Sequence, residues 1–231
     1  MFFFFADRKE NDKLIIDNKD DLTHLKVLRL NSDERLRIVF DDAIYLCEVS
    51  ELSKKRAEFK ILDKEDIFET KIKVNLYQGY PKKKKFEYII EKVVEIGIDS
   101  ITPFQSKNSV SKYESKKKER FKKIAKEACI QSHNPNMPEI KDIIDISDIK
   151  PAEGLNLILW HEADNNLRQV IKENRNINSV NFIVGSEGGL AIEEIQELKE
   201  KGFIPVKLPA NVLRTETAAL VFLSILRYEM Q

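Results

Sequence analysis

Residues 180–195 read VNFIVGSEGGLAIEEI, and residues 206–220 read VKLPANVLRTETAAL. The first stretch places three of the seven glycines, Gly185, Gly188 and Gly189, directly after a largely apolar, strand-like run. Glycine lets backbone approach a ligand closely or adopt a positive φ, so this spacing indicates a ligand loop. A plain turn and a phosphate-binding loop have similar sequences, although neither GxGxxG nor the P-loop pattern is present.

The second stretch places charged residues at the start of an apolar helix. Arg214 and Glu216 stand two positions apart, just before an almost entirely apolar run at 218–226. The two stretches follow consecutive predicted strands, at 180–184 and 203–208, and ligands of open α/β sheets bind beyond such strand ends. The pattern predicts one site made by both loops. The alternative is that Arg214 and Glu216 pair with each other as a structural clamp.

GSEGG followed by LRTETA resembles the RsmE family of the SPOUT superfamily, whose usual forms are GPEGG and ILRTETA. Its members use S-adenosylmethionine to methylate N3 of a uridine in 16S ribosomal RNA. The resemblance implies a PUA-like, RNA-binding β-barrel over residues 1–70 and a SPOUT methyltransferase domain over residues 71–231. It further implies a trefoil knot and a homodimer whose interface lies close to the cofactor pocket.

The pattern of hydrophobic residues independently indicates this fold class. Short β-type runs in the first 70 residues predict a small β-barrel, at 2–5, 14–16, 36–40, 44–49 and 57–62. Strands beginning near residues 72, 98, 155, 180 and 203 alternate with helices. That alternation predicts an α/β domain with a mainly parallel sheet.

The composition describes a soluble, globular chain, with 42% hydrophobic and 34% charged residues. The opening MFFFF meets charged residues at once, which is too short an apolar run for a signal peptide or membrane span. Cys47 and Cys129 are far apart and lie in no CxxC motif, so both are interpreted as reduced cysteines. We expect a cytoplasmic protein.

The charge is unevenly distributed along a chain whose net charge is zero. Residues 71–140 contain 16 Lys and Arg against 8 Asp and Glu, whereas residues 1–70 contain 13 against 17. A basic band is the electrostatic footprint expected for a phosphate backbone. The alternative is a solvated, Lys-rich helix face. With the resemblance, the band predicts 16S ribosomal RNA, within the small ribosomal subunit, as the partner.

The expected chemistry defines the roles in the site. Uracil N3 is a weak acid, so its methylation requires removal of a proton and stabilisation of the negative charge that results. Arg214 is the predicted stabilising group, because a guanidinium stays charged and offers planar donors. Glu216 or Glu187 is predicted to accept the proton or to hold Arg214 and the cofactor amine. No metal is expected.

The resemblance and the loops together predict the binding residues. The predicted cofactor-binding residues are Leu159, His161, Gly185, Glu187, Gly188, Gly189, Leu208, Val212, Leu213 and Thr217. The predicted RNA-binding residues are Arg29, Lys82, Lys83, Lys84, Lys85 and Lys92. Arg29 could equally form a surface salt bridge.

Five positions depart from the usual family pattern. Ser186 replaces a Pro, Pro209 stands where Gly is common, Asn108 and Asn134 stand where Arg is usual, and Ile130 replaces an acidic residue. These departures bear on the RNA and cofactor contacts. Two alternative functions therefore remain: a SPOUT methyltransferase acting on a different RNA nucleotide, and a catalytically silent RNA-binding protein of the same fold.

Overall fold

The structure is a computed structural model that describes residues 1–31, 34–67, 72–111, 113, 117–209 and 211–230. The chain forms two compact units. The N-terminal unit comprises residues 1–69 and 130–135, and the C-terminal unit comprises residues 70–129 and 136–231. The predicted domain boundary between residues 70 and 71 lies outside the described residues.

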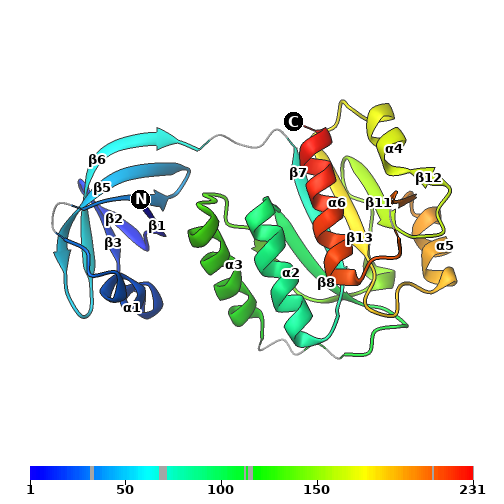
Figure 1. The fold of residues 1–231 in the computed structure, drawn as a ribbon, viewed down its shortest axis with the longest axis horizontal. Helices are drawn as coiled ribbons and strands as arrows, with labels where there is room; N and C mark the ends of the chain where they lie inside the picture. Colours follow the sequence, from blue (N-terminus) through cyan, green and yellow to red (C-terminus); the bar gives the residue numbers. More distant parts are fainter. Residues whose placement is uncertain (32–33, 68–71, 112, 114–116, 210, 231) are drawn as a thin grey trace. The chain divides into compact units, whose positions relative to one another are not determined.

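The N-terminal unit is one six-stranded sheet with one helix (Figure 1). Its strand order is β1-β4-β5-β6-β3-β2, with β1 parallel to β4 and the other neighbours antiparallel. The elements are β1 (Phe2–Phe5), β2 (Arg8–Glu10), β3 (Lys13–Ile16), α1 (Lys19–Leu28), β4 (Arg35–Phe40), β5 (Ala43–Leu52) and β6 (Ala57–Asp66). The β4–β5 hairpin turns at Asp41 with a φ of 48°, in the left-handed region that Asp tolerates.

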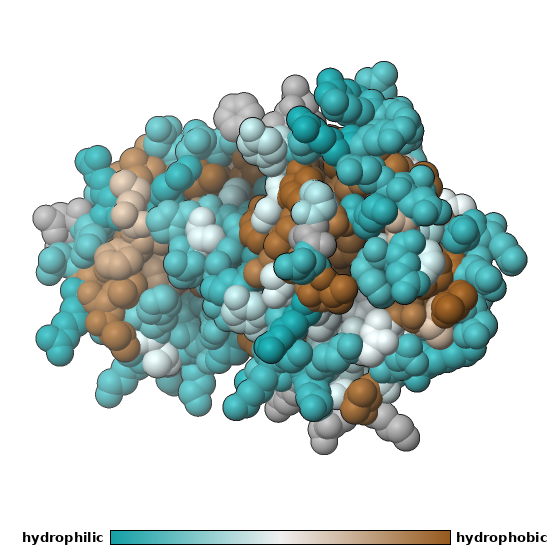
Figure 2. All heavy atoms as spheres, turned by 45° about the vertical axis from the view of Figure 1, so that its right-hand side comes forward, coloured by the Kyte–Doolittle hydropathy of each residue, from teal (hydrophilic) through white to brown (hydrophobic). Residues whose placement is uncertain are grey.

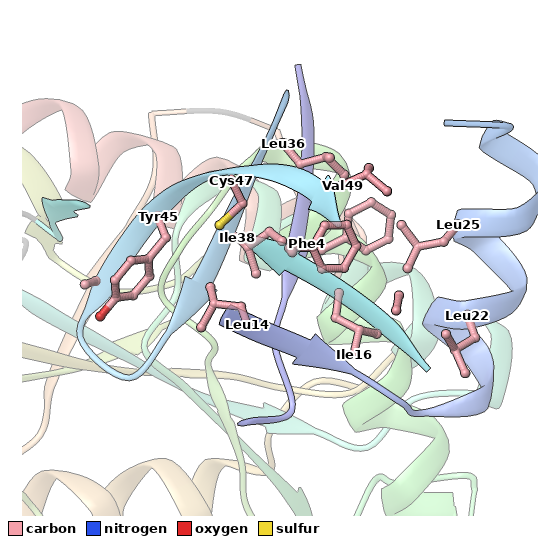
Figure 3. Packing of buried hydrophobic residues seen from close by; sticks show 13 residues of the cluster. Phe4, Leu14, Ile16, Leu22, Leu25, Leu36, Ile38, Tyr45, Cys47 and Val49 are labelled. Atoms are coloured by element: carbon pink, nitrogen blue, oxygen red, sulfur yellow. The ribbon is translucent and has the colours of Figure 1, made fainter. Parts of the chain in front are cut away.

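Side chains from five of these strands and from α1 form the core of the N-terminal unit (Figure 3). Phe4, Leu14 and Ile38 are at most 1% exposed, and Leu22 and Leu25 of α1 pack into the same cluster. Burial alternates over Arg35–Ile38 of β4 and Tyr45–Val49 of β5, because successive side chains point to opposite faces of the sheet. The predicted runs at 2–5, 14–16, 36–40, 44–49 and 57–62 are confirmed as β1, β3, β4, β5 and β6.

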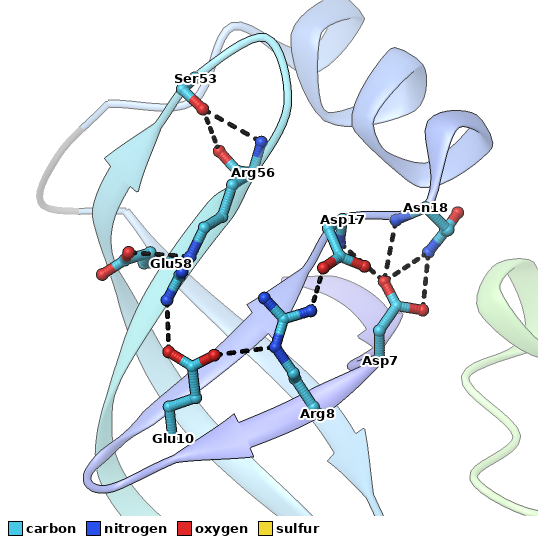
Figure 4. A network of polar contacts seen from close by, with 8 residues as sticks. All are labelled: Asp7, Arg8, Glu10, Asp17, Asn18, Ser53, Arg56 and Glu58. Carbon is cyan, nitrogen blue, oxygen red and sulfur yellow. Dashed lines mark hydrogen bonds and ion pairs between the residues drawn. The ribbon is translucent and has the colours of Figure 1, made fainter.

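Ion pairs surround the edge strand β2 (Figure 4). Arg8 contacts Asp17 and, at 2.8 Å, Glu10. Arg56 contacts Glu10 at 2.5 Å and Glu58 at 2.9 Å. Exposed pairs of this kind contribute little to stability individually, but charges along an edge strand oppose its pairing with another chain.

The C-terminal unit is built on an eight-stranded sheet in which all strand pairs formed by the described residues are parallel. Its order is β10-β8-β7-β13-β11-β14-β12, with β9 also pairing with β8. The strands are β7 (Lys73–Gly79), β8 (Ser100–Gln105), β9 (Glu139–Ile140), β10 (Ile144–Asp145), β11 (Leu155–Leu159), β12 (Asn165–Asn166), β13 (Ser179–Val184) and β14 (Ile204–Lys207). The five predicted strands are confirmed as β7, β8, β11, β13 and β14.

Helices pack against this sheet (Figure 1). They are α2 (Lys83–Ile96), α3 (Lys118–Ser132), the short 3-10 helix η2 (Ile146–Asp148), α4 (Leu167–Glu173), α5 (Ile192–Glu200) and α6 (Thr215–Glu229). Helices α2 and α6 lie side by side. Phe222 of α6 stacks on Phe182 of β13 with ring centroids 4.7 Å apart, which fixes α6 on the sheet.

Helix α4 begins directly after a short strand. It starts at Leu167, because Asn165 and Asn166 pair with β14 as β12 and Asn166 then caps α4. The final helix begins at Thr215, with the charged residues Arg214 and Glu216 at its start as predicted. Among the described residues, no helix is both long and apolar enough to cross a membrane.

Helix α6 has two apolar faces. One carries the buried residues that meet the sheet and α2, among them Phe222 and Leu226. On the other, Leu220, Val221 and Ile225 remain partly exposed. Figure 2 shows apolar side chains gathered near the middle of one face of the molecule and bordered by hydrophilic ones. Contiguous apolar surface of this kind is typical of contact sites between proteins.

Candidate active site

A cavity of about 440 Å³ lies at the carboxyl ends of β11, β13 and β14. Its walls are residues 159–161, 184–190, 208, 211–215 and 218, together with Lys85 of α2. Parallel neighbouring strands end at the same edge of a sheet, so the segments that follow them converge there. Both loops singled out from the sequence therefore line one cavity, as predicted.

The glycine loop, residues 185–189, follows β13 and folds back on itself. The Gly189 N–H donates to the Ser186 carbonyl at 3.0 Å, and Gly189 has a φ of +68°. A Cβ added to Gly185 would lie 2.9 Å from the Gly189 carbonyl carbon, closer than side chains pack. The turn consequently requires glycine at both positions and presents backbone to the cavity.

The segment that follows β8, at Lys107 and Asn108, packs closely against the glycine loop. Asn108 Nδ2 donates to the Gly188 carbonyl at 3.1 Å, and Ser186 Oγ donates to the Asn108 carbonyl at 3.3 Å. A Cβ on Gly188 would lie 2.8 Å from that Asn108 oxygen. Glu194, in the first turn of α5, holds this segment by accepting a hydrogen bond from the Lys107 N–H at 2.8 Å. Two of the departures from the family pattern, Asn108 and Ser186, thus contact each other.

Buried polar side chains join the two ligand loops. Thr215 Oγ1 donates to the Gly185 carbonyl at 2.6 Å and accepts a hydrogen bond from Gln78 Nε2 at 2.9 Å. Gln78, which is fully buried in β7, also donates to the Gly79 carbonyl at 3.0 Å. These contacts connect the glycine loop, the start of α6 and the end of β7, and so fix the base of the cavity.

Lys85 forms a charged cluster with carboxylates from both ligand loops. Its Nζ lies 3.6 Å from Glu187 Oε1 and 3.3 Å from Glu216 Oε2. Glu187 also accepts the backbone N–H of Lys82, at the N-terminus of α2, at 3.1 Å. The positive end of a helix dipole favours a carboxylate there. The cluster therefore connects α2 to the glycine loop and to α6.

Arg214 is the N-cap residue of α6, with φ −66° and ψ 153°, and its exposed side chain lines the cavity. The guanidinium and the helix N-terminus both favour negative charge at this place. Val212, which is 76% exposed, lines the same part of the cavity. A planar, partly anionic ligand group would meet a cation and an apolar surface together.

The structure places the predicted cofactor residues as follows. Those that line the cavity are Leu159, His161, Gly185, Glu187, Gly188, Gly189, Leu208, Val212 and Leu213. Thr217 is exposed and lies outside the cavity wall formed by the described residues. Of the predicted catalytic residues, Arg214 lines the cavity. Glu216 does not line it but forms an ion pair with Lys85, which does. His161 is exposed, and its Nε2 lies 3.5 Å from Glu162.

The predicted RNA-binding residues have different surroundings. Arg29 is exposed in the N-terminal unit, where it ends α1 in the left-handed conformation. Lys82 and Lys84 are exposed at the start of α2, with Lys83 between them in the chain. Lys92 pairs with Glu91 and Glu95 on its own helix, at 2.8 and 2.7 Å.

Several lining residues were not predicted, namely Trp160, Val184, Ser186, Leu190, Asn211, Thr215 and Ala218. Gln78 was missed as well. Its strand also contains the polar residues Lys73 and Asn75, so the sequence does not distinguish Gln78 as the buried one. Thr215 lies between Arg214 and Glu216 and carries no charge to mark it. Ile130, one of the departures, packs against the core of the N-terminal unit, where a carboxylate would be desolvated.

Two protein-family models match the chain. A model described as an RNA methyltransferase domain matches residues 68–227, and one described as an RNA methyltransferase PUA domain matches residues 16–62. These matches and the parallel sheet confirm the predicted fold class, a PUA-like module followed by a methyltransferase domain. The trefoil knot stays a prediction.

Relatives match over nearly the whole chain. Ribosomal RNA small subunit methyltransferase E of Aquifex aeolicus is 32% identical over 98% of this chain and 99% of its own. The protein of that name from Mesomycoplasma hyopneumoniae is 33% identical over 97% and 98%. A solved structure is also similar, that of the Neisseria gonorrhoeae protein of that name bound to S-adenosyl methionine. Its TM-score is 0.88 at 27% identity, and the match covers 99% of this chain and 97% of that one. The chain therefore belongs to the ribosomal RNA small subunit methyltransferase E family, as its GSEGG and LRTETA motifs predicted.

Proposed function

We propose that this protein transfers a methyl group from S-adenosylmethionine to N3 of one uridine in 16S ribosomal RNA. Family membership supports methylation of ribosomal RNA, and the related Neisseria gonorrhoeae structure contains S-adenosyl methionine. The observation that carries the proposal is that the glycine loop and the LRTETA segment line one cavity.

The residues of the cavity fit this cofactor. The volume lies within the range of small-molecule sites, roughly 300–1,000 Å³. The glycine loop gives the backbone polar groups that an adenosine and an amino acid moiety need, and a Cβ at Gly185 or Gly188 would disturb the loop. We assign the cofactor contacts to residues 185–190, to Leu208 and residues 211–213, and to Leu159 and His161, which all line the cavity. When bound, the cofactor supplies an electrophilic methyl group on its sulfonium.

The remaining chemistry belongs to the protein. Arg214 stabilises the negative charge that spreads over the uracil oxygens once N3 loses its proton. Glu187 and Glu216 both contact Lys85 at the cavity wall and are the two candidates to accept that proton. Separate Glu187→Gln and Glu216→Gln variants distinguish them. The acceptor is the residue whose loss lowers kcat while the Kd of the cofactor stays unchanged.

Residues of both units are assigned to RNA binding. We assign RNA backbone contacts to Arg29 in the N-terminal unit and to Lys82 and Lys84 at the start of α2, because exposed cations bind phosphate. The substrate proposed is the small ribosomal subunit, which places the enzyme in the cytoplasm. The partly exposed apolar residues of α6, Leu220, Val221 and Ile225, are assigned to a homodimer interface.

Methyl transfer to small subunits from a strain that lacks the gene tests the proposal. Purified protein and S-adenosylmethionine should create one new stop in primer extension on 16S ribosomal RNA, because an N3 methyl group blocks base pairing. Mass spectrometry of the nucleosides should identify 3-methyluridine. A methyl group on another nucleotide would establish a different RNA methyltransferase. Absence of heat on titration with the cofactor would instead indicate a silent RNA-binding protein.

A further inference from the structure

We propose that Lys85 is a positioning residue of the cofactor cavity and differs in role from the neighbouring lysines, which were all predicted to bind RNA. Its Nζ contacts Glu187 of the glycine loop and Glu216 of α6, at 3.6 and 3.3 Å. One ammonium on α2 thus connects both ligand loops. The inference rests on the proposed function for the identity of the ligand that those loops bind.

Solvent exposure separates Lys85 from Lys82 and Lys84. Lys82 and Lys84 are exposed, whereas the Lys85 side chain is 32% exposed and lines the cavity. Its partners are more enclosed, with side-chain exposures of 23% for Glu187 and 16% for Glu216. Ion pairs shielded from water are screened less by salt. Removal of one member of such a pair is costly, because the other charge is left without compensation.

The arrangement of the carboxylates shows what Lys85 does. Glu216 Oε2 is buried and has no hydrogen-bond partner among the described residues, so the Lys85 ammonium is the cation that compensates it. Without Lys85, the partly buried carboxylates of Glu187 and Glu216 would lose the cation that both of them contact. The other ionisable side chains in the cavity wall are Arg214 and His161. The glycine loop and the start of α6 would then lose their common partner.

Paired substitutions separate positioning from phosphate binding. Lys85→Met should raise the Kd of S-adenosylmethionine, measured by calorimetry, about tenfold, since the loss of roughly 1.4 kcal/mol corresponds to a factor of ten. The salt dependence of RNA binding should stay as in the wild type. Lys84→Met should leave the cofactor Kd unchanged and lower the slope of log K against log salt by about 0.7–0.9. Lys85→Arg should restore most of the cofactor affinity.

The opposite pattern overturns the proposal: Lys85→Met with normal cofactor affinity and a reduced salt slope would make Lys85 a phosphate contact. A wild-type protein that gives no heat with the cofactor would contradict the proposed function itself, which is a different result. Circular dichroism checks that each variant is folded.

A double-mutant cycle tests whether Lys85 acts through Glu216. In a Glu216→Gln background the buried carboxylate charge is absent, so Lys85→Met should cost clearly less cofactor affinity than it does in the wild type. Equal costs in both backgrounds would show that Lys85 does not act through Glu216, and would overturn the proposal.

Discussion

At the scale of single residues, one hydroxyl group joins the two ligand loops. Thr215 Oγ1 donates to the Gly185 carbonyl and accepts from Gln78 Nε2, and both side chains are buried. A buried polar group that loses its partner costs about 1–3 kcal/mol. The network therefore stabilises the loops in the geometry that forms the cavity.

Thr215→Val should lower the free energy of unfolding by about 1–3 kcal/mol, because the Gly185 carbonyl and the Gln78 amide lose a buried partner. Thr217→Val is the matched control, since Thr217 lies in the same helical turn but is exposed. Urea unfolding of both variants measures the difference. Equal midpoints would show that the hydroxyl of Thr215 contributes nothing to stability.

Arg214→Ala should reduce turnover by about a hundred- to a thousand-fold, the usual loss when one preorganised charge-stabilising donor is removed. Cofactor affinity should largely persist, because the glycine loop does not depend on this side chain. Single-turnover methylation and calorimetry measure the two effects. Arg175→Ala, at another exposed arginine, is the control. Near-normal turnover would reassign Arg214 to a structural role.

At the scale of elements, α6 is fixed at both ends. Thr215 joins its start to the glycine loop, and Arg227 joins its last turn to the end of α2. Arg227 donates from Nε to the Gly97 carbonyl at 2.7 Å, from Nη1 to the Ile72 carbonyl at 2.8 Å and from Nη2 to Asp99 at 2.8 Å. The helix that carries Arg214 and Glu216 is thereby held against the sheet.

Arg227→Met should lower the free energy of unfolding by about 2–3 kcal/mol, because two carbonyls and a partly buried carboxylate lose charged donors. Arg168→Met is the control. Arg168 also pairs with a glutamate, at 3.6 Å, but its side chain is 71% exposed, and such surface changes stay within about 0.5 kcal/mol. Thermal unfolding compares the two. A larger loss in the control would contradict this account of α6.

The long, periodic elements were predictable from the sequence, while contacts between distant segments were not. Strands such as β9 and β12 have two residues each, too few to show a period of two. Their pairing depends on neighbours far along the chain. Likewise, four consecutive lysines look alike in a sequence, and only the turn of α2 brings Lys85 to the carboxylates. By contrast, the glycine loop needs its glycines for local reasons, so their positions in the sequence indicated where the cavity lies.

At the scale of the whole molecule, each unit contains one buried cysteine. Cys47 lies in the core of the N-terminal unit and Cys129 in the C-terminal unit, and both are 0% exposed. Burial raises the pKa of each thiol to about 12. The stabilising contribution of the neutral thiols is therefore complete below the usual thiol pKa of about 8.5 and is lost as pH rises toward 12.

The folded protein should react slowly with a thiol reagent at pH 8, because neither thiol is accessible or ionised. As urea concentration rises, each cysteine should react when its own unit opens, and mass spectrometry of the labelled peptides should give two midpoints. A Cys47→Ala variant assigns the remaining signal to Cys129. Identical midpoints for both peptides would show that the units unfold together.

The bond between Thr215 and the Gly185 carbonyl also bears on protein synthesis, since its partners are 30 residues apart. A nascent chain that has left the ribosome only as far as β14 has its glycine loop but not the hydroxyl that fixes it. In such a chain the Gly185 carbonyl lacks the Thr215 donor that it has in the folded protein. Each newly made chain thus completes its cavity only after α6, whose Thr215 and Ala218 line it, has emerged from the ribosome that is translating it.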